Sequence, residues 1–395
     1  MLKSYLFSAT DKSLFDALNT SKIKNSQLRD LFLSRGVIIS TETSREELAK
    51  NFSKYNHDYY DHQVIASAMG VRPQREKQTS SEYITELSKD SLESAINKLK
   101  NKINSEQDLC IWSEKDKVIT IDVTYQTLDY SKSEFKQVVK KEATLTIEKT
   151  DDGYNIRYPV NPNVKEYEQY LRNELEKESK KDEVEFDLNN INLFSVDDPL
   201  LRTDFFINLI KNMSNFKLKD VTDVYVYHPK PENKAKIKDK DGKDGKDGET
   251  NSEIHISRAS LKGEGVLKSG EIQELYARGF YISKIRWKFE ESLIDSDIYE
   301  AEAQFDNPKD FTAFSYITRG KYKYQKKGQY NKNPVKLDDE EEMKITKVIE
   351  SSARVSADGI IKAVNAAKNA TKFVVKGGDN NESSKSEVIS TTNEK

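Results

Sequence analysis

Residues 57–62 (HDYYDH) combine histidine and aspartate at a spacing that suits metal binding. In a helix, residues four apart lie on one face, which would bring His57 beside Asp61 and Asp58 beside His62. Imidazole and carboxylate groups bind divalent metals. Acidic residues in a first helical turn also complement the helix dipole without any metal. Because no distant residues complete a ligand set, we favour this structural role and expect no metal site.

A second combination with catalytic potential is Asp122, on an expected strand, followed by Glu134-Phe135-Lys136. An acid followed by Glu-x-Lys is similar to a metal-dependent nuclease pattern, in which carboxylates hold the cation that activates water. Such a site also needs a third acid and a parallel strand, and the sequence places neither. A nuclease therefore remains an alternative, which substitution of Asp122 or Lys136 would test.

Other catalytic signatures are missing from the sequence. It has no Walker A motif, and Gly263-Glu264-Gly265 lacks the surrounding residues of a dinucleotide-binding turn. Cys110 is the single cysteine, which excludes an intrachain disulfide and a cysteine-based zinc site. We therefore expect a protein that is not an enzyme, with no catalytic residue and no cofactor.

The composition is that of a folded but strongly solvated chain. Of 395 residues, 33% are charged, yet 20 tyrosines and 16 phenylalanines provide the aromatic surface that cores require. The net charge of −3 gives no overall basic field, so nucleic-acid binding would depend on local patches. No apolar run approaches the length of a membrane span, and the N-terminus lacks a secretion signal pattern. We expect a cytoplasmic protein with no membrane partner.

The spacing of apolar residues predicts an α+β fold that begins with a helical module. This module, residues 1–70, has three short helices, two of them at 26–33 and 43–52 with an extended connection at 37–40. Gly70 ends its last helix. Residues 71–108 comprise a polar linker at 71–81 and a helix whose apolar residues run from Tyr83 to Ile103.

A body of antiparallel β-sheet with interspersed helices is predicted over residues 109–336, as one unit or as sub-domains 109–181 and 182–336. Strands are expected at 119–125, 143–147, 154–158, 221–227, 254–261, 280–289 and 298–305, and helices at 164–181, at 269–279, after Pro199 and after Asn307. The Gly-rich segment 229–251 is expected to be a flexible insertion. A long helix at 337–375 and a disordered tail at 376–395 follow.

Residues 22–54 resemble a known motif. Its core consists of Leu28-Arg29-Asp30-Leu31-Phe32, Arg35-Gly36-Val37 and Glu46-Glu47-Leu48. These segments are similar to the SAP and HeH/LEM-like family, which has a Leu-rich helix, an Arg-Gly turn, an extended connection and a second helix with a Glu-Leu pair. Gly36 suits the left-handed exit of the first helix, and Ser44 with Glu47 suits a capping box. The resemblance implies a module that binds DNA or, in some LEM-like members, another protein.

In SAP-like modules, the second helix and its entry present amides and basic side chains to phosphates. The resemblance assigns this role here to Lys22, Lys24, Arg35, Ser44, Arg45, Lys50 and Lys54. Helix N-termini bind anions, so the Thr43-Ser44-Arg45 corner is the strongest phosphate candidate.

A second basic region spans residues 319–336, which contain seven basic residues and no acidic one. Lysines neutralise phosphates and exposed tyrosines stack on bases, a combination that suits nucleic acid. The alternative is an edge strand with a solvated lysine face. The candidate contacts are Arg319, Lys321, Tyr322, Lys323, Tyr324, Lys326 and Lys327.

The sequence therefore predicts a bacterial, non-enzymatic DNA-associated protein, of a kind found in phage, plasmid or antiviral defence systems. Its head would contact duplex phosphates with little sequence preference, and its body would bind partners. The C-terminal helix has apolar residues at three-to-four spacing, which suits packing on its own body or self-association. The alternatives are a protein-interaction scaffold that binds no nucleic acid and the metal-dependent nuclease.

Overall fold

The computed structural model describes residues 9–69, 75–230 and 256–378, with side chains up to residue 368. The predicted α+β class is confirmed. The chain divides into two compact units, Met1–Asn189 and Asn190–Lys395. The expected insertion at 229–251 and the expected tail at 376–395 lie almost entirely outside the described residues.

The first unit begins with a helical head, for which the sequence predicted three helices and the structure has four. They are α1 (Asp11–Leu18), α2 (Asn25–Leu33), α3 (Arg45–Phe52) and α4 (Tyr59–Met69). Gly36 has a φ of +74° after α2, and Ser44 with Glu47 forms a reciprocal capping box on α3, both as expected. Phe32 and Phe52 meet edge to face, with ring centroids 5.1 Å apart in the head core.

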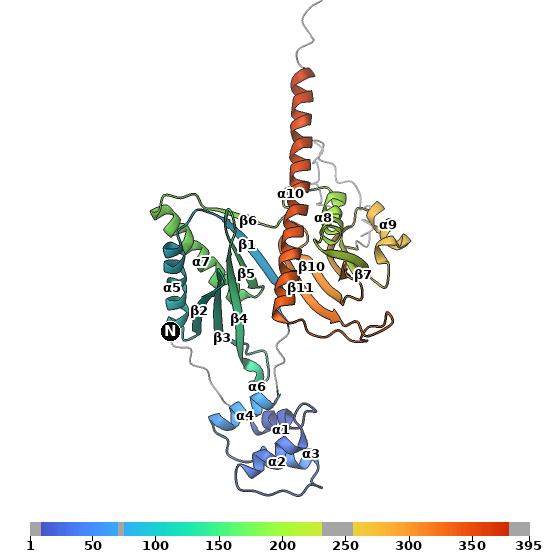
Figure 1. Cartoon of the computed structure of the whole chain (residues 1–395). Helices are drawn as coiled ribbons and strands as arrows, with labels where there is room; N and C mark the ends of the chain where they lie inside the picture. Colours follow the sequence, from blue (N-terminus) through green and yellow to red (C-terminus); the bar gives the residue numbers. More distant parts are fainter. Residues whose placement is uncertain (1–8, 70–74, 231–255, 379–395) are drawn as a thin grey trace, which may run out of the picture. The chain divides into compact units, whose positions relative to one another are not determined.

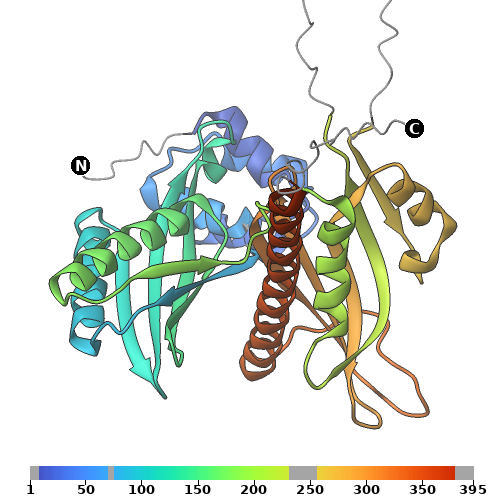
Figure 2. The same cartoon turned by 90° about the horizontal axis from the view of Figure 1, so that it is seen from above.

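The rest of the first unit is an antiparallel sheet covered by two helices. Its strand order is β2-β3-β4-β5-β1, and β6 pairs with β1. The strands are β1 (Gln78–Ile84), β2 (Leu109–Lys115), β3 (Val118–Leu128), β4 (Val138–Lys149), β5 (Gly153–Pro159) and β6 (Asp187–Asn190). Helices α5 (Lys89–Ser105) and α7 (Pro162–Lys181) lie side by side on one face (Figure 2). A single turn, α6 (Glu134–Gln137), connects β3 to β4.

The predicted end of the polar linker at residue 81 and the predicted start of the helix at Tyr83 are wrong, because β1 occupies residues 78–84. Residues 71–74 of the predicted linker lie outside the described residues. Tyr83 is buried opposite Tyr154 of β5, and its hydroxyl donates a hydrogen bond to Glu168 of α7. The helix begins only after Ser88, whose hydroxyl accepts a hydrogen bond from the Ser91 amide. Apolar residues of the strand happened to fall in register with those of the following helix, so periodicity alone merged the two elements.

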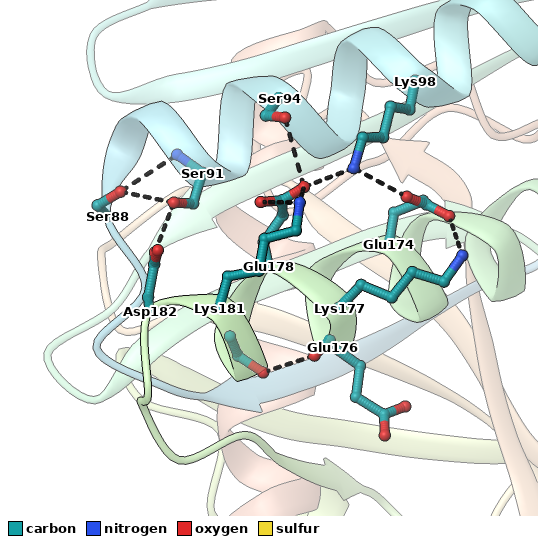
Figure 3. Close-up of polar contacts among 11 residues, drawn as sticks. Ser88, Ser91, Ser94, Lys98, Glu174, Glu176, Lys177, Glu178, Lys181 and Asp182 are labelled. Atoms are coloured by element: carbon teal, nitrogen blue, oxygen red, sulfur yellow. Dashed lines mark hydrogen bonds and ion pairs between the residues drawn. The ribbon is translucent and has the colours of Figure 1, made fainter.

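Polar side chains hold α5 against α7 (Figure 3). Lys98 Nζ lies 2.5 Å from Glu178 Oε1 and 3.1 Å from Glu174 Oε2, between two carboxylates that are almost fully buried. The hydrogen bond from Lys98 lowers the pKa of Glu178, and the one from Lys177 lowers that of Glu174. At the end of α7, Asp182 accepts a 2.5 Å hydrogen bond from the Ser91 hydroxyl. These contacts fix both the helix pair and the start of the next loop.

The second unit is another antiparallel sheet, of order β11-β10-β9-β7-β8. Its elements are α8 (Pro199–Lys211), β7 (Phe216–Tyr227), β8 (Arg258–Lys262), η1 (Val266–Lys268), α9 (Gly270–Ala277), β9 (Tyr281–Glu291), β10 (Ile298–Asn307), β11 (Thr312–Tyr322) and α10 (Asp339–Gly378). Helices α8 and α10 pack on this unit, and α10 continues beyond the strands (Figure 1). Ile345, Ile349 and Ala353 are buried in the core, so the first part of α10 packs on its own body.

The predicted helix after Asn307 is wrong. β10 ends there, and a tight turn leads directly into β11. Phe311 and Ala313 have φ values of +53° and +59°, which a right-handed helix cannot contain. Phe311 is nevertheless buried and stacks on Phe305, with ring centroids 4.1 Å apart. The apolar residues at 311–317 are therefore spaced for burial in the sheet core and do not form the face of a helix.

Candidate nucleic-acid interface

Arg35, two residues after α2, connects this part of the chain to α4 and to the segment before it. Its guanidinium forms an ion pair with Asp61 of α4 and donates a 2.8 Å hydrogen bond to the Asn56 carbonyl. It also lies over the rings of Phe52 and Tyr55, 5.0 and 5.4 Å from their centroids. The side chain is only 25% exposed. Its hydrogen-bonding groups are therefore used within the head, which removes Arg35 from the predicted phosphate contacts.

Arg45, the first residue of α3, has a similar internal role. Its Nη1 donates hydrogen bonds of 2.5 Å to the backbone carbonyls of Thr20 and Ile23. These bonds connect the start of α3 to the segment that precedes α2. The guanidinium binds backbone carbonyls here, whereas the sequence pattern assigned it to a phosphate.

The N-terminus of α3, which the resemblance makes the strongest phosphate candidate, already has anionic partners. The Glu47 amide donates to Ser44 Oγ at 3.3 Å, and the Glu47 carboxylate accepts from the Ser44 amide at the same distance. Glu46 adds a second negative charge to this turn. Like charges disfavour a phosphate at this corner, so the capping box replaces the anion that the pattern predicted.

Four lysines of the head remain exposed, namely Lys22, Lys24, Lys50 and Lys54. None of them forms an ion pair within the described residues. Residues 9–69 contain eight basic and eight acidic side chains, so the head as a whole is neutral. Its four free lysines therefore give only a weak local attraction for a polyanion.

The histidine–aspartate segment stabilises the head. His57 Nε2 lies 3.0 Å from the Phe52 carbonyl, and its Nδ1 lies 3.4 Å from Asp61 Oδ2. The Asp61 amide donates a 2.9 Å hydrogen bond to Asp58 Oδ1, which caps the start of α4. His62 stacks on Phe135 of α6, with ring centroids 4.6 Å apart, and burial lowers the pKa of His62. In the described part of the chain, no three metal-binding side chains gather into a site.

The residues of the nuclease alternative are not brought together. Asp122, in the middle of β3, accepts a 2.7 Å hydrogen bond from Thr144 of β4. Lys136 lies in α6, beyond the Leu128–Val138 pair that ends the β3–β4 ladder. Strand rise places this end of the ladder about 20 Å from Asp122. Phe135, between Glu134 and Lys136, is buried in the head core.

The second basic region forms an ordered hairpin, which we call the basic hairpin (residues 323–336). Isolated bridges pair Lys321 with Val335 and Tyr324 with Tyr330. The Gln325 amide donates to the Gln329 carbonyl at 2.9 Å, close to the tip. The loop after β11 is therefore held by its own backbone hydrogen bonds.

Two of the predicted contacts next to the hairpin are ion-paired within the second unit. Arg319 Nη2 lies 2.6 Å from Glu302, and Lys321 forms ion pairs with Glu341 and Asp297. Burial lowers the pKa of Lys321, but its acidic partners raise it more, so the net shift is upward and the ammonium stays charged. Arg319 therefore connects β11 to β10, and Lys321 connects β11 to α10.

The remaining lysines of the hairpin are exposed and unpaired within the described residues. They are Lys323, Lys326, Lys327, Lys332 and Lys336. The first three are among the predicted contacts, whereas the last two were only within the predicted segment. A run of lysines was the only signal available from the sequence, and it did not distinguish paired cations from free ones.

The tyrosines pack against neighbours and do not stand free. Tyr324 and Tyr330 meet edge to face with centroids 5.6 Å apart, and Lys219 lies over Tyr330. Tyr322 lies under Lys288 of β9, whose Nζ is 4.8 Å from the ring centroid. Lys288 is a neighbour that the sequence could not identify, because it comes from another strand. The rings are half-buried and pack against the hairpin or its neighbours. They therefore do not present the freely exposed ring faces that the base stacking considered from the sequence would need.

The chain matches no model of a known protein family, and no curated protein is similar to it. The resemblance of residues 22–54 to SAP and HeH/LEM-like motifs therefore stays a prediction. Among the described helices, none combines the length and the apolar character that spanning a membrane requires.

Proposed function

We propose that this protein is a non-enzymatic, DNA-associated protein that contacts phosphates mainly through the basic hairpin of its second unit. The observation that supports this proposal is the set of five exposed lysines without an ion-pair partner in the described residues. A lysine that neutralises a phosphate releases a counterion, which gives affinity without sequence preference. The packed tyrosines favour such phosphate-led binding over stacking on bases.

The head is a secondary contact in this proposal. Its arginines hold the helices together, and its acidic residues balance its basic ones. Lys22, Lys24, Lys50 and Lys54 can approach a phosphate only as scattered point charges. The sequence pattern made the head the main phosphate contact, whereas this proposal gives that role to the basic hairpin.

The test is binding of labelled duplex and single-stranded DNA at several salt concentrations. Two variants each remove three charges: Lys323→Gln/Lys326→Gln/Lys327→Gln in the hairpin and Lys22→Gln/Lys50→Gln/Lys54→Gln in the head. We expect the hairpin variant to reduce the slope of log affinity against log salt by about 0.9 for every lysine that contacts duplex DNA. An equal loss from both variants would contradict a hairpin-led contact. Absence of binding at low salt would remove the proposal.

A protein-interaction scaffold is the second candidate, supported by exposed apolar side chains on the head. Ile38 is 88%, Tyr60 75% and Leu33 60% exposed. Arg35, which lies between Leu33 and Ile38 in the sequence, contacts Asn56 and Asp61, so this segment lies beside the start of α4. Salt-insensitive binding to one protein, lost in Ile38→Ser/Tyr60→Ser, would favour the scaffold.

A further inference from the structure

The turn between β9 and β10, residues 292–297, presents two consecutive aliphatic side chains to solvent, which we call the aliphatic pair (Leu293 and Ile294). Leu293 is 71% and Ile294 94% exposed, the latter the highest value among the large apolar side chains of the described residues. Neither belongs to the core of the second unit. A single exposed aliphatic residue is common on protein surfaces, but two at the tip of one turn suggest a contact with another molecule.

The turn is held in one shape by bonds at its base. The Ser296 hydroxyl donates a hydrogen bond to the Glu291 carbonyl at 3.2 Å, and the Ser292 amide donates one to the Asn215 carbonyl at 3.4 Å. Asp295 has a φ of +60°, a left-handed conformation found mainly in tight turns. The turn therefore holds the aliphatic pair outward and does not let it fold back onto the sheet.

The basic hairpin lies beside this turn. Ile298, the first residue of β10, pairs with Glu290 of β9 and with Tyr322 of β11. The turn and the hairpin therefore leave the sheet at the same end. The Tyr324 amide of the hairpin donates a 2.8 Å hydrogen bond to Asp297 of the turn, which connects the two loops directly. The aliphatic pair is thus a neighbour of the residues proposed to contact phosphates.

Most acidic side chains around the turn are neutralised by cations of the same unit. The ion pairs are Glu290–Lys219, Glu291–Lys344 and Asp297–Lys321, with N–O distances of 2.7, 2.5 and 3.5 Å. The acidic first turn of α10, which follows the hairpin, complements the dipole of that helix. Within the turn and the hairpin, the described charges without an ion-pair partner are the five hairpin lysines and Asp295. The surface next to the aliphatic pair is therefore basic.

We propose that the aliphatic pair inserts between two base pairs of duplex DNA and bends the duplex while the hairpin lysines hold its phosphates. This inference rests on the proposed DNA contact. Architectural DNA-binding proteins insert leucine and isoleucine in this way from the minor groove, where these side chains unstack a base step and kink the duplex. The exposed apolar surface of the pair is covered by the unstacked bases. Pyrimidine–purine steps such as TA unstack easily, so the partner is duplex DNA that contains such deformable steps.

An anionic membrane surface also attracts aliphatic side chains that lie beside lysines. Interfacial helices, however, bury the apolar face of a whole amphipathic helix, whereas this turn offers only two side chains. A wedge of two aliphatic side chains suits a single base step better. The observations therefore favour DNA, and a membrane is an outcome that the test distinguishes.

The test uses the full chain and short duplexes that have a donor dye at one end and an acceptor dye at the other. One duplex has a central TA step, and the other has a stiff A-tract at this place. Energy transfer reports bending, and fluorescence anisotropy reports affinity. We expect the protein to raise energy transfer in the TA duplex and to bind it about tenfold more tightly than the A-tract duplex.

The wedge variant is Leu293→Ser/Ile294→Ser. The matched control is Leu33→Ser/Ile38→Ser, which replaces exposed residues of the same two types in the head. The wedge variant should lose the bend and the preference for the TA duplex but keep the salt dependence that the hairpin lysines set. The control should keep all three properties. Leu293→Ile/Ile294→Leu retains the aliphatic surface and should retain the bend.

Binding without a bend, or a bend that the wedge variant keeps, overturns this inference and leaves the hairpin-led contact in place. Absence of binding to both duplexes at low salt overturns the inference together with the proposed function. An equal loss of bending in the head control also overturns it, because the effect would not be specific to the turn. Binding to phosphatidylserine vesicles that requires the aliphatic pair, with no bend in either duplex, assigns the turn to a membrane surface instead.

Discussion

The head and the basic hairpin each contain several basic residues, but they use these cations differently. In the head, Arg35 and Arg45 bind carbonyls and Asp61 of the same module. In the hairpin, lysines such as Lys326 and Lys327 extend into solvent. Arginine offers five donors in a rigid fork and satisfies several carbonyls at once, whereas lysine is a strongly hydrated point charge. A basic residue is therefore available to a ligand only when the fold has not already used it.

The largest expected effect is on the head. Arg35→Ala removes an ion pair, a hydrogen bond to a carbonyl and contacts with two rings, and should lower the free energy of unfolding by about 2–4 kcal/mol. Arg35→Lys keeps the positive charge but not the planar, forked guanidinium. It should therefore recover only a minor part of the lost free energy of unfolding. Urea unfolding of the full chain measures both. Unchanged stability together with weakened DNA binding would mean that Arg35 contacts DNA and does not hold the head together.

A smaller effect is expected beside the hairpin. Arg319→Gln removes one of two cations that bind Glu302, whose side chain is 3% exposed, and should cost about 1–2 kcal/mol. Burial raises the pKa of Glu302, but hydrogen bonds from Lys284 and Arg319 lower it further, so the net pKa lies below 4.5. The stability that this shift gives is present above pH 4.5 and is lost as the pH falls below it. In Arg319→Gln, this acid-dependent loss of stability should be smaller, which unfolding at pH 7 and pH 4 would show.

The free lysines should have no effect on stability. Lys326→Gln/Lys327→Gln is expected to change the free energy of unfolding by less than about 0.5 kcal/mol, because neither side chain has an ion-pair partner among the described residues. The same variant should weaken DNA binding. A marked loss of stability would mean that the hairpin lysines are structural, like the arginines of the head.

The smallest effect concerns pH. Burial against Phe135 lowers the pKa of His62 below 6.5, so the folded state resists its protonation. The stability gained from neutral His62 is therefore complete above pH 6.5 and decreases as the pH falls below that value. His62→Phe keeps a ring for stacking and should reduce the difference between unfolding at pH 7.5 and pH 5.5. Greater stability of the parent chain at pH 5.5 than at pH 7.5 would contradict the expected direction of this pH dependence.

Local sequence signals predicted much of the fold. Alternation located β3 and β4, and the capping box of Ser44 and Glu47 marked the start of α3. The prediction failed at β1 and after Asn307. There, apolar residues at helical spacing belong to strands and a turn, and the core buries them without any helix. In such short runs, tertiary burial decides the element and periodicity does not.

For the candidate interface, the sequence identified the basic residues but not their availability. The partners that use them lie far along the chain, as in the pairs of Arg35 with Asp61 and of Lys321 with Glu341. Such long-range contacts leave no local pattern.

Phe135 has a consequence for how the chain folds. This side chain completes the core of the head, yet it enters from α6, after three strands of the sheet. During synthesis the four N-terminal helices leave the ribosome before Phe135 does, so their core stays incomplete until that later segment arrives. Closing a long loop before the contact forms makes this a slow step compared with helix formation. The head therefore completes its folding together with the sheet, because its core depends on a residue that lies outside the head.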